Sequence, residues 1–201
     1  MKIIGITGGV GAGKSQILTF IKEHYKCRIC MADEVAKQIQ LPGGICYEPI
    51  VALLGTGILD ADGYIIKSEM AKRIFEDKTL LEKVNHIVHP GVRTYLEKAC
   101  EEERKRGEAE LFFIEAALLI ENGYCDFVDE MWYIYADKGV RIARLKESRG
   151  YTDEKIHQIM ACQLSEEEFR DKSDFVIDNS RSLKETQEQI KTKLEDYTWL
   201  K

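Results

Sequence analysis

A glycine-rich octapeptide near the amino end constrains the fold of this chain more than any other feature. It follows the apolar run Ile3-Ile4-Gly5-Ile6 and reads Gly8-Gly9-Val10-Gly11-Ala12-Gly13-Lys14-Ser15. Helical spacing of apolar residues begins directly after it, so the context is a strand, a turn and the start of a helix. Glycines let main-chain amides approach phosphate oxygens, a lysine neutralises the outer phosphates, and a hydroxyl ligates Mg2+. The octapeptide therefore predicts a nucleoside triphosphate site, with a ligand-free glycine-rich turn as the alternative.

Length, composition and charge limit the class of protein. The chain has 201 residues, of which 44% are hydrophobic, and this suits one domain with a substantial core. Its net charge of −6 argues against a nucleic-acid-binding surface, which needs clustered lysine and arginine. The apolar start is interrupted by Gly5 and then Gly8-Gly9, and no later span approaches the roughly 18 apolar residues of a membrane helix. These features predict a cytoplasmic protein that binds neither nucleic acid nor membrane.

Six cysteines raise the question of disulfides or zinc, and Cys27-Arg28-Ile29-Cys30 has the spacing of a redox pair. That pair falls in a predicted strand, where an offset of three residues sends the two side chains to opposite faces, whereas redox pairs occupy helix N-termini. The sequence has no second Cys-x-x-Cys motif to complete a zinc site. We therefore expect buried, reduced thiols at Cys27, Cys30, Cys46, Cys100, Cys125 and Cys162.

Strand and helix signals alternate on both sides of a purely helical block. Apolar runs predict strands at 3–6, 27–31, 110–115, 130–136 and 174–178. Apolar residues at helical spacing predict helices at 15–24, 33–40, 140–148, 152–163 and 183–196. This alternation predicts an α/β fold, in which a P-loop NTPase-type parallel sheet is covered by helices on both faces and collects its ligands at the carboxyl ends of its strands.

The helical block is interpreted as an insertion of residues 45–106 into a core formed by residues 1–40 and 108–201, within a single domain spanning 1–201. Its helical patterns lie at 48–54, 67–75, 79–88 and 91–106. The last two patterns are separated by Pro90, which favours the first turn of a helix. The tetrapeptide Asp60-Ala61-Asp62-Gly63 resembles a calcium loop or a GTPase switch, but it lacks the third oxygen ligand and the preceding hydrophobic strand, so we expect a turn.

Asp33 is a candidate for chemistry because it follows the second predicted strand, at the edge where a parallel sheet collects ligands. A carboxylate held there can take the proton of a hydroxyl that accepts a phosphoryl group. The alternative is that Asp33 only caps the following helix, since Asp is a favoured N-cap residue. Spacing alone does not separate these two roles.

The order of several motifs resembles that of dephospho-coenzyme A kinases over nearly the full length. The phosphate loop is followed by Ala32-Asp33 with Ala36, then Asn85 and His89-Pro90, Leu118-Leu119-Ile120-Glu121, and Asp174-Phe175-Val176-Ile177-Asp178-Asn179. The loop occurs in many families, but its combination with the His-Pro pair and the Leu-Leu-x-Glu segment is specific. The resemblance implies transfer of the ATP γ-phosphoryl group to the ribose 3′-hydroxyl of dephospho-coenzyme A, the last step of coenzyme A synthesis. It also implies that the insertion binds the acceptor and that residues 138–163 form a helical lid.

The chain departs from that family pattern at several positions. Met31 stands where the family usually has the first Asp of Asp-Ala-Asp, Glu115 and Ala117 stand where Asp and Pro are common, and Gln16 replaces a frequent Thr. The second aspartate, Asp33, is retained, and the resemblance assigns it as the catalytic base. The departures therefore concern the acceptor and metal contacts more than the nucleotide site.

The resemblance also assigns residues outside the loop. Arg144 best matches the lid arginine that reaches the transferring phosphates, a task that suits a planar, permanently charged guanidinium. Arg149 matches only with a shift of one residue, and Arg141 is interpreted as part of a solvated helix face. His89 is implied in acceptor binding, the alternative being a helix boundary. Asn179 is implied near the adenine, the alternative being an ordinary turn residue.

Together these assignments predict direct, in-line phosphoryl transfer with ATP and Mg2+. Asp33, Lys14 and Arg144 are the predicted catalytic residues, Asp33 and His89 bind dephospho-coenzyme A, and Ser15 ligates the metal. The alternatives are another small P-loop kinase acting on a nucleoside or nucleotide and, disfavoured by the missing Asn-Lys-x-Asp motif, a non-enzymatic nucleotide switch. The sequence does not predict an oligomeric state. The predicted nucleotide contacts are Gly9, Val10, Gly11, Ala12, Gly13, Lys14, Ser15, Gln16, Arg144 and Asn179.

Overall fold

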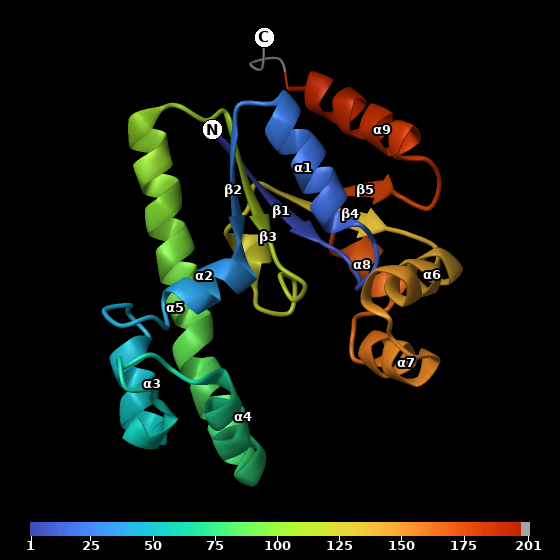
Figure 1. Ribbon diagram of the computed structural model, residues 1–201. Coiled ribbons are helices and arrows are strands. Elements are labelled where there is room, and N and C mark those ends of the chain that lie inside the picture. The colour runs from blue at the N-terminus through green and yellow to red at the C-terminus, as the bar shows by residue number, and fades with distance from the viewer. Residues whose placement is uncertain (198–201) are drawn as a thin grey trace. The chain divides into compact units, whose positions relative to one another are not determined.

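A computed structural model describes residues 1–197 of the chain, apart from the side chain of Lys78 (Figure 1). The chain divides into two compact units. The first combines Met1–Ile29 with the chain from Arg106 onward, and the second is Cys30–Lys105. The phosphate loop belongs to the first unit, and Asp33 and His89 belong to the second.

Five strands form one sheet in the order β2-β3-β1-β4-β5. The strand pairs β1–β3, β1–β4 and β4–β5 are parallel. Ile6 lies opposite Glu115, and Tyr135 lies opposite Asp178, so the carboxyl ends of these strands share one edge of the sheet. The predicted parallel sheet is confirmed, with strands β1 (Lys2–Thr7), β2 (Cys27–Met31), β3 (Leu111–Glu115), β4 (Glu130–Tyr135) and β5 (Phe175–Asp178).

Helices α1 (Lys14–His24) and α9 (Leu183–Glu195) contribute to one apolar core with the sheet (Figure 1). Both helices bury residues at spacings of three and four, which is the period that places side chains on one helix face. Burial of these side chains supplies the main driving force that fixes α1, and with it the phosphate loop, against the strands. The core includes Ile17, Phe20 and Ile21 of α1, Ile190 and Leu194 of α9, and Ile4, Ile6, Phe113 and Trp132 of the sheet.

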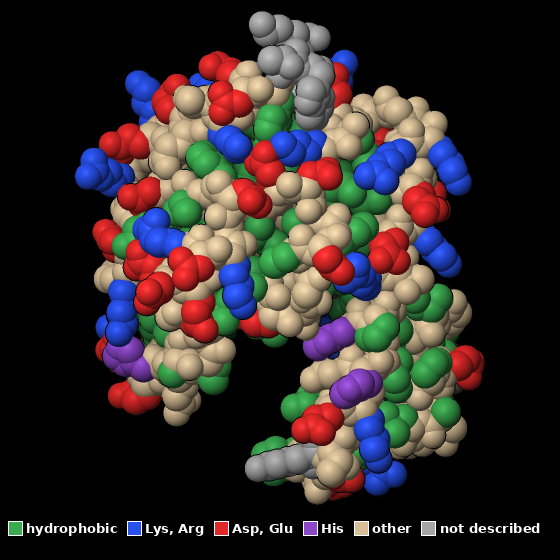
Figure 2. All heavy atoms as spheres, turned by 180° about the vertical axis from the view of Figure 1, so that it is seen from behind, with side chains coloured by type: hydrophobic (Ala, Val, Ile, Leu, Met, Phe, Trp, Pro, Cys, Tyr) green, Lys and Arg blue, Asp and Glu red, His purple; other side chains and the backbone are tan. Residues whose placement is uncertain are grey.

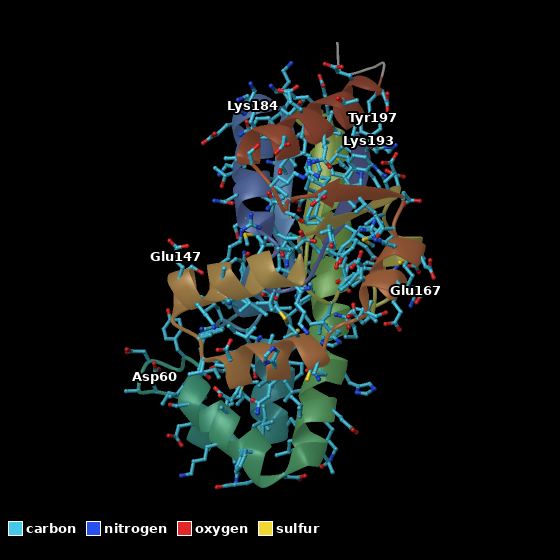
Figure 3. The ribbon with its side chains drawn as sticks, turned by 90° about the vertical axis from the view of Figure 1, so that its right-hand side faces the viewer. Asp60, Glu147, Glu167, Lys184, Lys193 and Tyr197 are labelled. Atoms are coloured by element: carbon cyan, nitrogen blue, oxygen red, sulfur yellow. The ribbon has the colours of Figure 1, made fainter. Side chains whose placement is uncertain are left out.

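A polar cluster around Glu130 ties the carboxyl end of α9 to the first residues of β1 and β4 (Figure 3). The Glu130 carboxylate accepts hydrogen bonds from Lys2, from Trp132 Nε1 at 3.0 Å and from Tyr197 Oη at 2.6 Å. Lys193 Nζ lies 3.3 Å from the same group. Burial alone raises the pKa of this carboxyl, but the three hydrogen bonds and the Lys193 charge outweigh it and lower the pKa to about 2.

Helices α6 (Lys138–Arg149), α7 (Asp153–Ala161) and α8 (Glu166–Asp171) complete the first unit, with a short 3-10 turn η2 (Tyr124–Asp126). The helix predicted at 152–163 ends earlier, at Ala161, and α8 was not predicted. A capping box explains α8, because the Ser165 side chain accepts from the Glu168 amide and Glu168 accepts from the Ser165 amide. Phe169 of α8 then stacks on Tyr133 of β4 at 4.7 Å between ring centroids.

The second unit is helical, and one of its predicted boundaries was wrong. Residues 78–106 form one continuous helix with Pro90 inside it, rather than two helices separated at His89-Pro90. Val84, Val92, Leu96, Ala99 and Cys100 are buried on α5 at helical spacing on both sides of the proline. Packing of this continuous stripe outweighs the one hydrogen bond that proline removes. The unit contains α2 (Ala32–Gln38), α3 (Tyr47–Leu54), the 3-10 turn η1 (Thr56–Ile58), α4 (Lys67–Glu76) and α5 (Lys78–Arg106).

The acidic tetrapeptide of this unit is a turn, as predicted. Asp60 Oδ1 accepts from the amides of Asp62 at 3.0 Å and Tyr64 at 2.8 Å, which is the hydrogen bonding of an Asx turn. Gly63 supplies the left-handed conformation at φ +85°. The side chain of Asp60 is therefore used to shape its own loop.

The surface adds three observations. Cys30, Cys46 and Cys100 are buried, Cys27 is half-buried, and Cys125 and Cys162 are exposed. The prediction of buried thiols was therefore only partly right at Cys27 and wrong at the two exposed positions, which fall in a 3-10 turn and at the end of α7. No helix within residues 1–197 combines the length and the apolar character needed to cross a bilayer. On the face shown in Figure 2, cationic and anionic side chains are intermixed.

Candidate active site

The phosphate loop connects the end of β1 to the start of α1. Gly13 is the N-cap residue of α1 and takes the left-handed conformation, with φ 93° and ψ 21°. Lys14 Nζ donates a hydrogen bond to Gly8 O at 2.8 Å, so the lysine side chain folds back across the loop. The first amides of a helix have no carbonyl partner within the helix and carry partial positive charge. The loop and the first turn of α1 are therefore suited to hold an anion.

Glu115 lies beside the loop at the carboxyl end of β3. Its carboxylate is 3.6 Å from Lys14 Nζ, and the residue is only 8% exposed. Ser15 is exposed in the first turn of α1. A hydroxyl and a carboxylate are oxygen donors of the kind that Mg2+ prefers in phosphate sites. The donor set around Lys14 thus fits a magnesium ion that is shared with bound phosphates.

Asn179 and Arg144 meet the loop from two other elements. Asn179 follows β5 and is 1% exposed; its Nδ2 donates to Ala12 O at 2.8 Å, and its Oδ1 accepts from Thr186 Oγ1 at 2.9 Å. Arg144 of α6 donates through Nη2 to Asn179 O at 2.9 Å and through Nη1 to Ala12 O at 3.4 Å. The structure therefore brings three predicted nucleotide contacts together around one carbonyl group.

Arg141 is not part of a solvated face, and that interpretation was wrong. Its side chain lies over the loop, where Nε donates to Val10 O at 2.9 Å and Nη2 donates to Gln163 Oε1 at 2.9 Å. A Cβ atom added at Gly9 would lie 2.2 Å from Arg141 Nη2, so the absence of a side chain at Gly9 is what admits the guanidinium. Burial lowers the pKa of Arg141 from its ordinary value.

Two amides of the predicted phosphate cradle already have protein acceptors. Val10 N donates to Gln163 Oε1 at 3.1 Å, and Ala12 N donates to Gly9 O at 3.1 Å. In this conformation both groups stabilise the loop itself. In this conformation the amides of Val10 and Ala12 are therefore not available to a phosphate, although both lie in the predicted run from Gly9 to Ser15.

The remaining four predicted residues have exposed side chains; they are Gln16, Asp33, His89 and Arg149. Gln16 is exposed on α1, and Arg149 lies at the end of α6 with its guanidinium 5.9 Å from the ring centre of Tyr151. Asp33 is exposed in the first turn of α2, whose N-cap residue is Met31, so the alternative that Asp33 is the cap was wrong. His89 is exposed on α5.

Gln163 was missed entirely, and Glu115 was noted only as a departure from the family pattern. Glu115 follows four buried apolar residues at the end of a strand, which is the signal that could have identified it. Gln163 carries no comparable signal, because it lies in the loop between α7 and α8 and acts through tertiary contacts.

Comparison with known proteins places this geometry in a family. A family model described as dephospho-CoA kinase matches residues 2–185. The chain belongs to the dephospho-CoA kinase family. A dephospho-CoA kinase from Streptococcus mutans is 34% identical over 193 residues, which cover 96% of each chain. A solved structure from Thermus thermophilus superposes with a TM-score of 0.78 and 26% identity, and covers 97% of both chains. Dephospho-CoA kinase from Campylobacter jejuni has the same fold, with a TM-score of 0.72, 24% identity and 97% coverage of both chains.

Family membership confirms the resemblance that was inferred from the order of the motifs. The range matched by the family model, residues 2–185, includes parts of the first unit and all of the second. The helical second unit therefore belongs to the region that the family model matches.

Proposed function

We propose that this chain transfers the γ-phosphoryl group of ATP to the ribose 3′-hydroxyl of dephospho-CoA, giving CoA and ADP. The observation that carries the proposal is the convergence of Lys14, Arg144 and Asn179 on the phosphate loop in a chain of the dephospho-CoA kinase family. A loop of this kind alone serves many reactions, and the family selects among them.

The triphosphate binds at the amino end of α1. Main-chain amides of the loop and of the first helical turn hold the phosphate oxygens, since they point along the positive end of the helix dipole. Lys14 exchanges its hydrogen bond with Gly8 O for the outer phosphates. The carboxylate of its neighbour Glu115 lies 3.6 Å from Lys14 Nζ and attracts the lysine side chain toward the end of β3.

Arg144 and Asn179 contribute from the sides of the loop. The guanidinium of Arg144 is already hydrogen-bonded to the loop, and a planar cation held there can bind oxygens of the transferring phosphoryl group. Asn179 holds Ala12 through its side chain and Arg144 through its carbonyl, and thereby fixes their spacing. Helices α6 and α7 act as the lid that carries Arg144.

A magnesium ion bound with ATP would be held by Ser15 Oγ, with Glu115 as a partner through water. When bound, such an ion neutralises charge on the phosphate oxygens and orients them. Hydroxyl and carboxylate oxygens are ligands that Mg2+ accepts, whereas the Lys14 ammonium would serve the phosphates.

Asp33 takes the proton of the acceptor hydroxyl. The ribose oxygen then forms a bond to the γ-phosphorus while the bond from that phosphorus to the β–γ bridging oxygen breaks, and ADP leaves. His89 and the helical second unit hold the acceptor, so that binding energy from the rest of dephospho-CoA positions one hydroxyl group.

A panel of acceptors tests the proposal. The protein is supplied with ATP and Mg2+ and, separately, with dephospho-CoA, adenosine, AMP and shikimate, and ADP release is followed with a coupled assay. We expect ADP release that depends on dephospho-CoA and exceeds the rate with each other acceptor by at least a hundredfold. A faster reaction with a nucleoside, or release that is independent of the acceptor, would reject the proposal.

A further inference from the structure

The peptide groups on both sides of Val10 are held by a closed set of three hydrogen bonds. Gln163 Oε1 accepts from Val10 N at 3.1 Å and from Arg141 Nη2 at 2.9 Å, and Arg141 Nε donates to Val10 O at 2.9 Å. One amide oxygen thus joins the loop to a cationic side chain. We call these three residues the Val10 clamp.

The clamp joins three separate segments of the first unit. Val10 belongs to the phosphate loop, Arg141 to the first turns of α6, and Gln163 to the connection after α7. Helices α6 and α7 lie side by side in both Figure 1 and Figure 3, and Gln163 N donates to Met160 O at 3.3 Å, which continues the last turn of α7. The clamp therefore connects the loop to both arms of the lid at once.

Peptide geometry shows what the clamp controls. Val10 lies between Gly9 and Gly11, and these glycines leave the loop with unusual rotational freedom. In a planar trans peptide the N–H group points opposite to the C=O group of the preceding residue. Arg141, by holding Val10 O, therefore sets the direction of the Gly11 N–H group, and Gln163, by holding Val10 N, sets the direction of Gly9 O.

We propose that Gln163 is a positioning residue for phosphoryl transfer: it holds the Val10 peptide and the Arg141 guanidinium in the geometry in which the loop binds the ATP phosphates. This inference rests on the proposed function and adds a residue to it. Only the acceptor atom of Gln163 takes part in the clamp, so a carboxylate of the same length can replace the amide, whereas a thioether of similar shape cannot.

The clamp is partly exposed, and this separates its positioning effect from an effect on folding. Val10, Arg141 and Gln163 are each of intermediate exposure, so water can satisfy the released groups when Gln163 is replaced. We therefore expect little loss of stability and a specific loss of nucleotide affinity.

Amide hydrogen exchange of Val10, measured by NMR without nucleotide, tests the geometry. In Gln163→Met the exchange of this amide is expected to accelerate at least tenfold, while Gln163→Glu retains the protection of the unmodified protein. Unchanged Val10 exchange in Gln163→Met would overturn the clamp. The matched control is Gln187→Met on α9, which replaces a glutamine of similar exposure outside the site and should leave Val10 exchange unchanged.

Steady-state kinetics and calorimetry test the positioning role. Gln163→Met is expected to raise the KM for ATP and the Kd for ADP about tenfold, while the KM for dephospho-CoA and the temperature of the thermal unfolding midpoint stay unchanged. In Gln163→Glu, the KM for ATP and the Kd for ADP are expected to equal those of the unmodified protein. Equal rises in both KM values together with a fall in thermal midpoint would reduce Gln163 to a structural residue, and an unchanged Kd for ADP would reject its role. If the unmodified protein does not phosphorylate dephospho-CoA, the proposed function fails, while the Val10 exchange and the ADP affinity still decide the clamp.

Discussion

Replacing Gly13 by alanine probes how closely the phosphate loop packs against the turn after β5. Gly13 has φ +93°, and a Cβ atom added there would lie 2.3 Å from Asn179 Nδ2. The substitution has two costs, because it forces an L-residue into the left-handed region and displaces a buried amide. The Asn179 Nδ2 group then loses its 2.8 Å hydrogen bond to Ala12 O.

The two costs have known sizes. The left-handed backbone costs an alanine about 1–2 kcal/mol, and a buried hydrogen bond left unmade costs about 1–3 kcal/mol. The expected loss of unfolding free energy in Gly13→Ala is therefore about 2–5 kcal/mol. Because the displaced groups line the phosphate loop, ATP affinity should fall with it.

Gly150→Ala is the matched control. Gly150 also has a positive φ, +59°, but nothing lies within 4 Å of an added Cβ atom. This variant carries the backbone cost alone, about 1–2 kcal/mol. Urea unfolding and thermal melting of both variants isolate the Asn179 contribution, which should appear as a further decrease of about 2–12 °C in the melting temperature of Gly13→Ala. Equal losses in the two variants would show that Asn179 does not pack on Gly13 as described.

Three further predictions concern single carboxylates and the loop lysine. Asp33→Asn should keep ATP affinity and lower kcat at least a hundredfold in the coupled assay, since the acceptor proton loses its base; unchanged turnover would remove Asp33 from that role. Lys14→Met should lower kcat/KM for ATP about a hundredfold or more, and wild-type values would reject its contact with the outer phosphates. Glu130 has a pKa lowered from 4.5 to about 2, so its stabilisation, about 3 kcal/mol, is present above pH 4.5 and is lost as the pH falls toward 2. Urea unfolding between pH 7 and pH 3 should therefore show a weaker pH dependence in Glu130→Gln, and an identical dependence would contradict the cluster.

The sheet and the loop were predictable because their signals are local. Strands such as Leu111–Glu115 are unbroken apolar runs, and Lys14 and Ser15 follow glycines at a fixed spacing. Helix α8 was missed although its capping box, Ser165 to Glu168, is visible in the sequence, because six residues give too little periodicity to detect. The capping signal was present, but the segment was too short for a helix to be predicted from it.

The contacts around the loop were harder to predict because they join distant segments. Arg141 and Arg144 lie one helical turn apart, and both donate hydrogen bonds to the loop. In the sequence, an arginine that contacts the loop looks the same as an arginine on a solvated helix face, because both carry the same charge. Gln163 joins Val10 across 153 residues of sequence. Pro90 inside α5 was also mispredicted because tertiary contacts decided the outcome. Buried side chains on both sides of the proline stabilise one continuous helix, and their packing overrides the local helix-breaking signal.

Transfer of a labelled phosphoryl group is the sharpest test of the proposed reaction. The protein is incubated with Mg2+, dephospho-CoA and ATP whose γ-phosphoryl group carries heavy oxygen, and the products are separated and fragmented by mass spectrometry. We expect CoA with the labelled group on the ribose 3′-oxygen, formed together with unlabelled ADP. Labelled inorganic phosphate beside unchanged dephospho-CoA would contradict it.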